Sequence, residues 1–240
     1  MKKKLFSIVL CMVCMAGASA QSRWSVTPKA GIVVSNFNNE MYNGLSLDLS
    51  NHVDFTVGAD VEYSLSDYVG LLSGINYNRV GGKCEGVFLK MSNLMMDYTV
   101  SDITDKLYYL QIPLMVNVYL TKGLAIKGGL QLGAKVGTKE TYHYVLSTID
   151  MQKYPDPIMV PNGKDWRDFE TITIEGDESG SVSDVRTLDF GIPLGASYEY
   201  KNIVLDARYY LGLSNITSAN NAKMNTRYLS VTLGYKFHLK

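Results

Sequence analysis

The sequence predicts an all-β protein, an eight-stranded antiparallel up-and-down transmembrane β-barrel with short periplasmic turns and long extracellular loops. Three observations support this: apolar and polar residues alternate with period two in eight segments, charges and glycines gather on one face of each segment, and short connections alternate with long ones. The expected strands are residues 24–36, 52–65, 68–80, 106–120, 123–137, 186–200, 202–214 and 227–239.

The last segment, residues 227–239, shows the pattern most clearly. Its odd positions from Leu229 to Leu239 are apolar, whereas its even positions are mostly polar. Side chains in a strand point to opposite faces in turn, so each segment has one apolar and one polar face. Three prolines fall inside the segments, and because proline removes a ladder donor, bulges are expected at Pro28, Pro113 and Pro193.

Alternation alone does not distinguish a membrane barrel from a soluble one, which turns its apolar face inward. The composition of the polar face favours the membrane barrel, because its many glycines suit a narrow interior rather than a soluble exterior. The apolar face is nearly free of charge and carries aromatics near the strand ends, as expected at two membrane interfaces. These aromatics are Trp24, Tyr63, Tyr198, Tyr200, Tyr235 and Phe237 toward one rim and Phe55, Tyr108, Phe190 and Tyr209 toward the other.

The connections indicate which end of the barrel is which. Tight turns are expected at Ser66-Asp67, Thr121-Lys122 and Lys201, and long loops at residues 37–51, 81–105, 138–185 and 215–226. In outer-membrane barrels the turns are periplasmic and the loops extracellular, so both termini are expected in the periplasm. Within the third loop, residues 141–149 and 169–175 alternate again, which indicates a hairpin that extends its two neighbouring strands.

The N-terminus has the three parts of a secretory signal peptide. Three lysines precede an apolar run from Leu5 to Met15, and small residues lead to Ala20, where cleavage is expected. The run is too short for a membrane-anchoring helix, and Val13 before Cys14 disfavours a lipoprotein. Residues 1–20 are therefore expected to be a signal peptide, and residues 21–240 a single barrel domain.

Several segments resemble the PorT-like outer-membrane β-barrel family of Bacteroidetes, which are small barrels of the OmpX/OmpA-like kind. The resemblance rests on the segments YLQIPL at 109–114, DFGIPLG at 189–195 and ARYYLGL at 207–213. The end of the chain is similar to the C-terminal signal read by the barrel assembly machinery, with Thr232, Gly234, Phe237 and Leu239 in the matching places. The family implies the fold and an outer-membrane location rather than one activity, although a few members are linked to protein secretion.

The polar face of the eight segments carries both signs of charge. Either these residues line a selective channel, or they pair with one another and fill the lumen. An eight-stranded barrel is only wide enough for its own side chains, which favours pairing. The expected lumen charges are Lys29, Asp54, Asp60, Glu62, Lys127, Lys135, Asp189, Glu199, Asp206, Arg208 and Lys236.

The sequence shows no pattern of a catalytic, metal or cofactor site. There is no phosphate-binding glycine loop and no zinc-ligand spacing. A histidine and serine on the lipid-facing wall would suit a lipid A-modifying enzyme, and His143 with Ser147, or His52 with a nearby serine, are the candidates. Acidic residues of the third loop could bind calcium, although a solvated surface is the simpler interpretation. They are Asp165, Asp168, Glu170, Glu175, Asp177 and Glu178.

The sequence therefore predicts a non-enzymatic integral outer-membrane barrel with a filled lumen, serving a structural or surface-interaction role. A small porin-like channel and a lipid A-modifying enzyme are the alternatives. The expected partners are outer-membrane lipid and lipopolysaccharide, the barrel assembly machinery during insertion, and an extracellular or periplasmic protein. Lysine and arginine together number 23, as do aspartate and glutamate, which gives no electrostatic case for nucleic acid.

Overall fold

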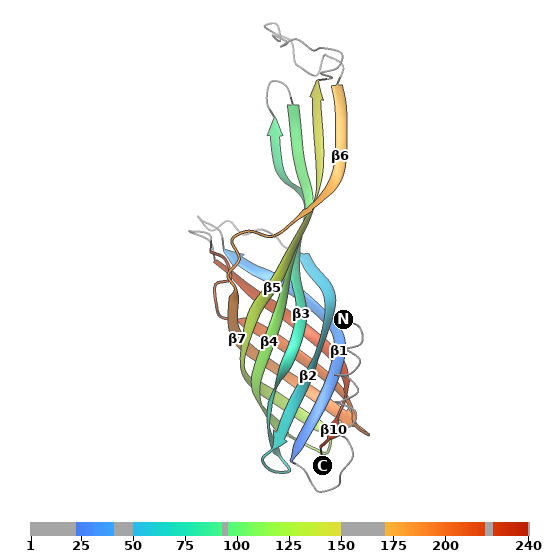
Figure 1. Cartoon of the computed structure of the whole chain (residues 1–240), viewed down its shortest axis with the longest axis vertical. Coiled ribbons are helices and arrows are strands. Elements are labelled where there is room, and N and C mark those ends of the chain that lie inside the picture. The colour runs from blue at the N-terminus through green and yellow to red at the C-terminus, as the bar shows by residue number, and fades with distance from the viewer. Residues whose placement is uncertain (1–22, 41–49, 93–95, 150–170, 219–222, 240) are drawn as a thin grey trace, which may run out of the picture.

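The computed structural model describes residues 23–40, 50–92, 96–149, 171–218 and 223–239 (Figure 1). The predicted signal peptide and the acidic positions Asp165, Asp168 and Glu170 lie outside these residues. The described chain forms one antiparallel sheet of ten strands. They are β1 (Trp24–Glu40), β2 (Ser50–Ser64), β3 (Val69–Ser92), β4 (Met96–Tyr119), β5 (Leu124–Ile149), β6 (Thr171–Gly180), β7 (Leu188–Tyr200), β8 (Ile203–Gly212), β9 (Lys223–Tyr235) and β10 (Phe237–His238).

Eight of these strands close into a ring. The order β1-β2-β3-β4-β5-β7-β8-β9 is completed because β1 also pairs with β9, from Lys29 opposite Gly234 to Glu40 opposite Lys223. Each strand of the ring is antiparallel to both of its neighbours. The predicted eight-stranded antiparallel up-and-down arrangement is therefore confirmed.

The ring is apolar outside and polar inside. Along β4 the exposed fractions of Ile112 and Leu114 are 50% and 62%, whereas the preceding Gln111 and the later Asn117 are 0% and 2% exposed. This is the reverse of a soluble barrel and is the pattern of a wall that contacts lipid. No helix within the described residues has the length and apolarity to cross a membrane.

Three strands of the ring continue well beyond it. β3, β4 and β5 extend upward and, together with β6, form a four-stranded sheet above the barrel (Figure 1). We call residues 84–92, 96–104, 141–149 and 171–180 the fin. The expected loop at 81–105 is wrong for most of its length, since it is strand up to Ser92 and again from Met96. The hairpin expected from the alternation at 141–149 and 169–175 is confirmed by the pairing of β5 with β6.

The prolines do not cause the predicted bulges. The β3–β4 register is the same on both sides of Pro113, and the β5–β7 register is the same on both sides of Pro193. Pro28 pairs regularly with Ala59 of β2. On the other side of β1, the neighbouring strand is interrupted at Lys236, which separates β10 from β9. Each proline therefore costs a local ladder bond without adding a residue. Register shifts fall instead toward the fin, between Asn51 and Thr56, Cys84 and Leu89, Ser101 and Thr104, and Tyr108 and Tyr109.

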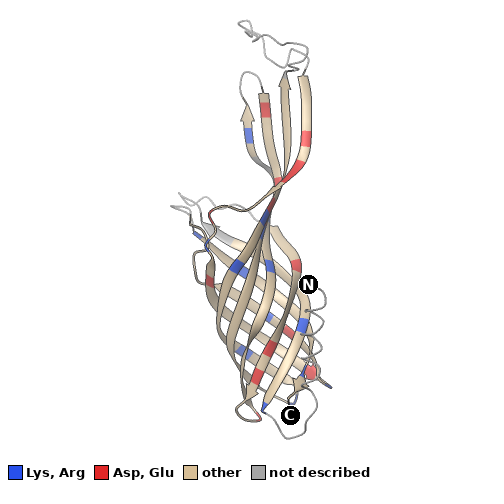
Figure 2. Cartoon of the chain, viewed as in Figure 1, with Lys and Arg blue, Asp and Glu red and all other residues tan. Residues whose placement is uncertain are grey.

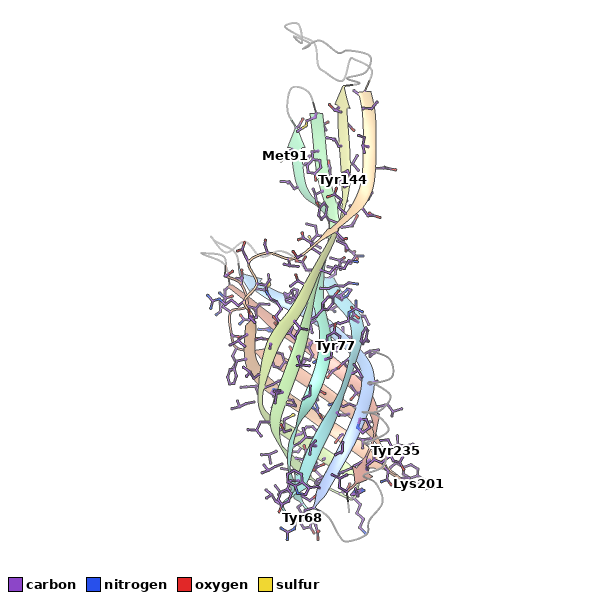
Figure 3. The ribbon with its side chains drawn as sticks, in the orientation of Figure 1. Tyr68, Tyr77, Met91, Tyr144, Lys201 and Tyr235 are labelled. Carbon is purple, nitrogen blue, oxygen red and sulfur yellow. The ribbon has the colours of Figure 1, made fainter. Side chains whose placement is uncertain are left out.

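The tight connections lie at the end of the ring opposite the fin. β7 and β8 are joined by Lys201 and Asn202, both with positive φ (45° and 70°), as a two-residue hairpin turn requires. Trp24 pairs with Tyr63 at the same end, close to the β2–β3 turn. Figure 3 shows Tyr68, Lys201 and Tyr235 at this end, which we call the turn end.

Candidate functional site

The middle of the lumen holds five charged side chains in contact. Asp60 accepts hydrogen bonds from Lys29 (2.7 Å) and Arg208, and Asp206 accepts them from Arg208 (3.1 Å between Nη2 and Oδ2) and Lys127. All five are at most 8% exposed, although they come from β1, β2, β5 and β8. Because buried charges are tolerated only when paired, this layer joins strands from opposite sides of the ring. Charged positions of both signs are visible on the barrel strands in Figure 2.

A second charged layer lies nearer the turn end. Lys236 Nζ is 3.1 Å from Glu62 and 3.2 Å from Glu199. The hydroxyl of Tyr119 donates to Glu62 (2.6 Å) and accepts from Lys236 (3.0 Å). β9 thus connects to β2, β4 and β7 through a single ammonium group, since Lys236 directly follows that strand.

A layer of side-chain amides and hydroxyls lies on the fin side of the central charges. The hydroxyl of Tyr228 donates to Gln111 (2.7 Å) and accepts from Gln131 (2.8 Å) and Asn78 (3.2 Å). Asn78 also donates to Gln111 and accepts from Thr56. These uncharged groups hydrogen-bond to one another across the ring, so side chains fill the lumen at this level as well.

The fin end of the lumen is closed by an apolar plug. Ile216, on the connection between β8 and β9, is fully buried in it, and the connection before β7 packs against it through Val182 and Val185. The two connections are held together by a bridge between Val185 and Thr217 and by a 2.7 Å bond from Arg186 N to the Ile216 carbonyl. The plug consists of Val33, Phe37, Val80, Leu107, Tyr109, Tyr210, Ile216 and Tyr228.

Little space remains among these layers. One cavity of about 30 Å³ lies beside the two charged layers, and one of about 10 Å³ lies between the central charges and the amide layer. Such volumes hold at most about one or two water molecules. Neither cavity is large enough to pass a solute between the described side chains.

Eight of the eleven expected lumen charges lie in the two charged layers, and the other three lie elsewhere. Asp54 is 3.3 Å from Arg79 near the fin-side rim, Lys135 donates to the carbonyl of Val185, and Asp189 accepts from Ser214 (2.6 Å). The amide layer and the plug were not predicted from the sequence. Inward apolar residues near one strand end, such as Val33 and Leu107, were the available signal for the plug.

The other candidate residues are not brought together. His143 contacts Asp177 (3.0 Å) and Ser147 contacts Thr173 (3.1 Å), so neither reaches the other by a described bond. His52 contacts Asp54 at 3.4 Å inside the rim. Of the positions of the C-terminal signal, Thr232 and Gly234 lie in β9 and Phe237 lies in β10. Leu239 directly follows β10, and its N–H donates to the Trp24 carbonyl (2.9 Å).

The fin has one apolar and one polar face. On β5, the side that faces the lumen continues past the bulge near Val136 as the apolar face of the fin. The side that faces the lipid continues as the polar face of the fin. Several of its apolar side chains are between one third and about one half exposed, and Met91 and Tyr144 are labelled in Figure 3. The apolar face consists of Leu89, Met91, Met96, Tyr98, Val100, Tyr144, Leu146, Ile172 and Ile174.

The outward side of the sheet changes from apolar to polar between the ring and the fin, and this change marks where the lipid ends. Up to Tyr108 the outward residues of β4 are apolar, and beyond it they are Lys106 and Thr104. Tyr108 belongs to an aromatic group with Phe55 and Tyr77, whose ring centroids lie 6.2–6.4 Å apart. We take this group as the interface, with the fin in water.

Two carboxylates face each other at the base of the fin. Asp105 pairs directly with Glu140 across the β4–β5 ladder. Burial, and to a lesser extent the charge of Glu140, raises the pKa of Asp105 to about 6. The ionised form is thus disfavoured in the folded state, and the base of the fin is less stable above this pH than below it.

Replacing Asp105 with asparagine should stabilise the fin base by about 1–2 kcal/mol at pH 7.5, since water at this partly exposed site screens part of the repulsion. The gain should shrink as the pH falls through about 6 toward about 4, where the wild-type carboxyl is protonated in both states. Amide hydrogen exchange in residues 96–106 would measure it. Asp102→Asn, at an exposed neighbouring position, is the control, and an equal gain at every pH would contradict the explanation.

Comparison with known proteins agrees with this architecture. A family model described as outer membrane protein beta-barrel domain matches residues 19–218. No curated protein sequence matches the chain. Similar solved structures include Ail of Yersinia pestis (13% identity over 90% of this chain and 99% of that one, TM-score 0.42) and Neisserial surface protein A (18%, 92% and 99%, 0.36). OprG from Pseudomonas aeruginosa is similar at 11% identity, 92% and 98% coverage and a TM-score of 0.40.

Proposed function

The chain belongs to the outer membrane protein beta-barrel domain family, and from this premise we propose that it is a non-enzymatic surface-interaction protein of the outer membrane. Its barrel serves as a closed anchor, and its fin binds a partner protein. The setting we propose is secretion or envelope assembly, as the resemblance to PorT-like barrels implies. The short turns then face the periplasm, and the fin stands outside the cell.

The exposed apolar face of the fin carries this proposal. Leu89, Met91 and Ile174 are 42%, 54% and 47% exposed on a sheet that stands beyond the lipid boundary. Apolar surface held in water is unfavourable by roughly 25 cal/mol per Å², so a contiguous apolar face marks a contact surface. A closed lumen gives the barrel no comparable surface of its own.

The edge of the fin indicates the chemistry of the partner. Among the described strands β6 pairs with β5 alone, so its other edge offers backbone groups to an added strand. β6 carries three acidic residues and no basic one, and acidic positions are red on its ribbon in Figure 2. We therefore propose an extended segment with apolar residues toward Ile172 and Ile174 and basic residues toward Glu175 and Asp177.

A photo-crosslinking amino acid at Ile174 in living cells would test this proposal. We expect one discrete protein adduct, and its loss when Ile172 is changed to aspartate on the same face. Glu85, exposed at the fin base and away from the β6 edge, is the matched control position and should give no such adduct. Adducts with lipopolysaccharide or with a second copy of the chain alone would contradict the proposed partner.

The two alternatives lack a supporting geometry. A pore requires a passage that the charged layers and the apolar plug fill. A lipid A-modifying enzyme requires a histidine and serine together on the lipid-facing wall, whereas His143 and Ser147 lie on the fin with other partners. Lipid A mass spectra that change with expression of the protein would favour the enzyme over our proposal.

A further inference from the structure

Three cations lie together on the outer wall, just beyond the aromatic group that marks the lipid boundary. Arg79 pairs with Tyr108, and two residues farther toward the fin Lys106 pairs with Gly81 on one side and with Lys139 on the other. Residues directly opposite in a ladder share a face, with Cβ atoms about 4.5–5.5 Å apart. Arg79, Lys106 and Lys139 therefore form one basic group across β3, β4 and β5.

The two ammonium groups of the Lys106–Lys139 pair repel each other, which destabilises the sheet at this position. Like charges directly opposite each other destabilise a sheet. Neither ammonium group has an ion pair among the residues that the structure describes. The adjacent acids do not relieve the repulsion, because Asp105 and Glu140 project from the opposite face of the sheet and repel each other there. An anion on the outer face would offset the repulsion.

Arg79 is held in a fixed position beside this pair. Its guanidinium lies 4.8 Å from the ring centroid of Phe55 and 5.2 Å from that of Tyr108, and its Nε is 3.3 Å from Asp54. A guanidinium has five N–H donors, so contact with one carboxylate leaves others available. The aromatic contacts fix the group at the level of the membrane interface.

The height of the group matches that of lipid phosphates. Lys106 and Lys139 lie two residues beyond the Tyr108 pair, or about 7 Å at the usual strand rise. Long cationic side chains at such a position reach the interface, where ammonium and guanidinium groups bind phosphate by charge-assisted hydrogen bonds. At the opposite end of the ring Lys122 and Lys201 lie in separate turns, and no like-charge pair is opposed across a ladder between the residues described there.

We propose that Arg79, Lys106 and Lys139 form a binding site for the phosphate of a membrane lipid in the leaflet on the fin side. In the orientation proposed above this is the outer leaflet, whose glycolipid carries phosphate on its sugar head. A phospholipid headgroup offers the same chemistry. The site rests on the lipid boundary and does not depend on what the fin binds.

The test is binding of the full-length mature barrel in detergent to purified bisphosphorylated lipid A, measured by native mass spectrometry or calorimetry. Dephosphorylated lipid A and phosphatidylglycerol are the comparison lipids. We expect bisphosphorylated lipid A to bind at least about tenfold more weakly to the double variant Lys106→Gln/Lys139→Gln. The control Lys122→Gln/Lys201→Gln, which removes the same charge at the turn end, should bind as the wild type does.

Equal loss of phosphatidylglycerol binding in the Lys106→Gln/Lys139→Gln variant would support the phosphate site and assign it to phospholipid. Binding of dephosphorylated lipid A as tight as that of the phosphorylated form would overturn the site, as would unchanged binding by the double variant. Folding is checked separately by the heat-modifiable gel shift without lipid. There the double variant should be at least as stable as the wild type, since a repulsion is removed, whereas a merely structural role for the lysines would make it less stable.

Discussion

Replacing Arg208 with methionine is expected to lower the free energy of unfolding by about 3–5 kcal/mol, the range for removing one partner of a buried ion pair. Arg208 is the only residue of the central layer that contacts both Asp60 and Asp206. Lys29 and Lys127 would each retain one carboxylate, but both acids would lose their shared partner at sites at most 4% exposed. Methionine cannot supply the missing donors.

The loss should appear as a lower temperature for disappearance of the heat-modifiable gel shift, or as a lower urea midpoint in detergent. Arg227→Met is the matched control. Arg227 is exposed on the neighbouring strand β9, so its replacement removes the same charge without changing the lumen. It should change stability by no more than about 0.5 kcal/mol. If the two variants proved equally stable, the central layer would not hold the ring together.

Arginine at Leu114 is expected to cost about 2–4 kcal/mol, the penalty for a cation at the middle of the lipid-facing wall. Leu114 is 62% exposed on β4, midway between Tyr108 at the fin-side boundary and Leu120 at the turn end. Leu114 is paired with Leu130 on one side and with Ser73 on the other, whose hydroxyl donates to the Pro113 carbonyl (2.9 Å), so no carboxylate there can pair with the guanidinium.

Leu120→Arg is the matched control at the exposed position directly after β4, where the side chain reaches the interface and the expected cost falls to about 0–1 kcal/mol. Reversible unfolding in lipid vesicles measures both. A penalty that does not depend on depth would mean that the outer wall is not in contact with lipid as assigned.

Much of the ring could be predicted from sequence because alternation is a local signal. Each half-buried strand shows period two by itself, and the inward position of residues such as Asp60 and Arg208 follows from its phase. Which charges pair depends on register across strands far apart in the chain. The contact of Arg208 with Asp60, 148 positions away, is therefore visible only in the structure.

The fin was harder to predict because its strands contain irregularities that break the alternation. Asp102 has a positive φ of 54°, and shifts in register precede and follow it, so residues 81–105 lack the pattern of one continuous strand. The plug had a different obstacle. Ile216 belongs to a connection, and no periodicity indicates that a loop side chain folds into the mouth of a barrel.

The central claim is that the lumen is closed and that function lies on the surface of the protein. Conductance of the purified protein in planar lipid bilayers tests it most directly, with the heat-modifiable gel shift used to show that the sample is folded. The layers from Lys236 to Ile216 predict no steady conductance at any applied voltage below that which breaks the bilayer. Stable, reproducible single-channel openings from folded protein would contradict the closed lumen and favour the pore.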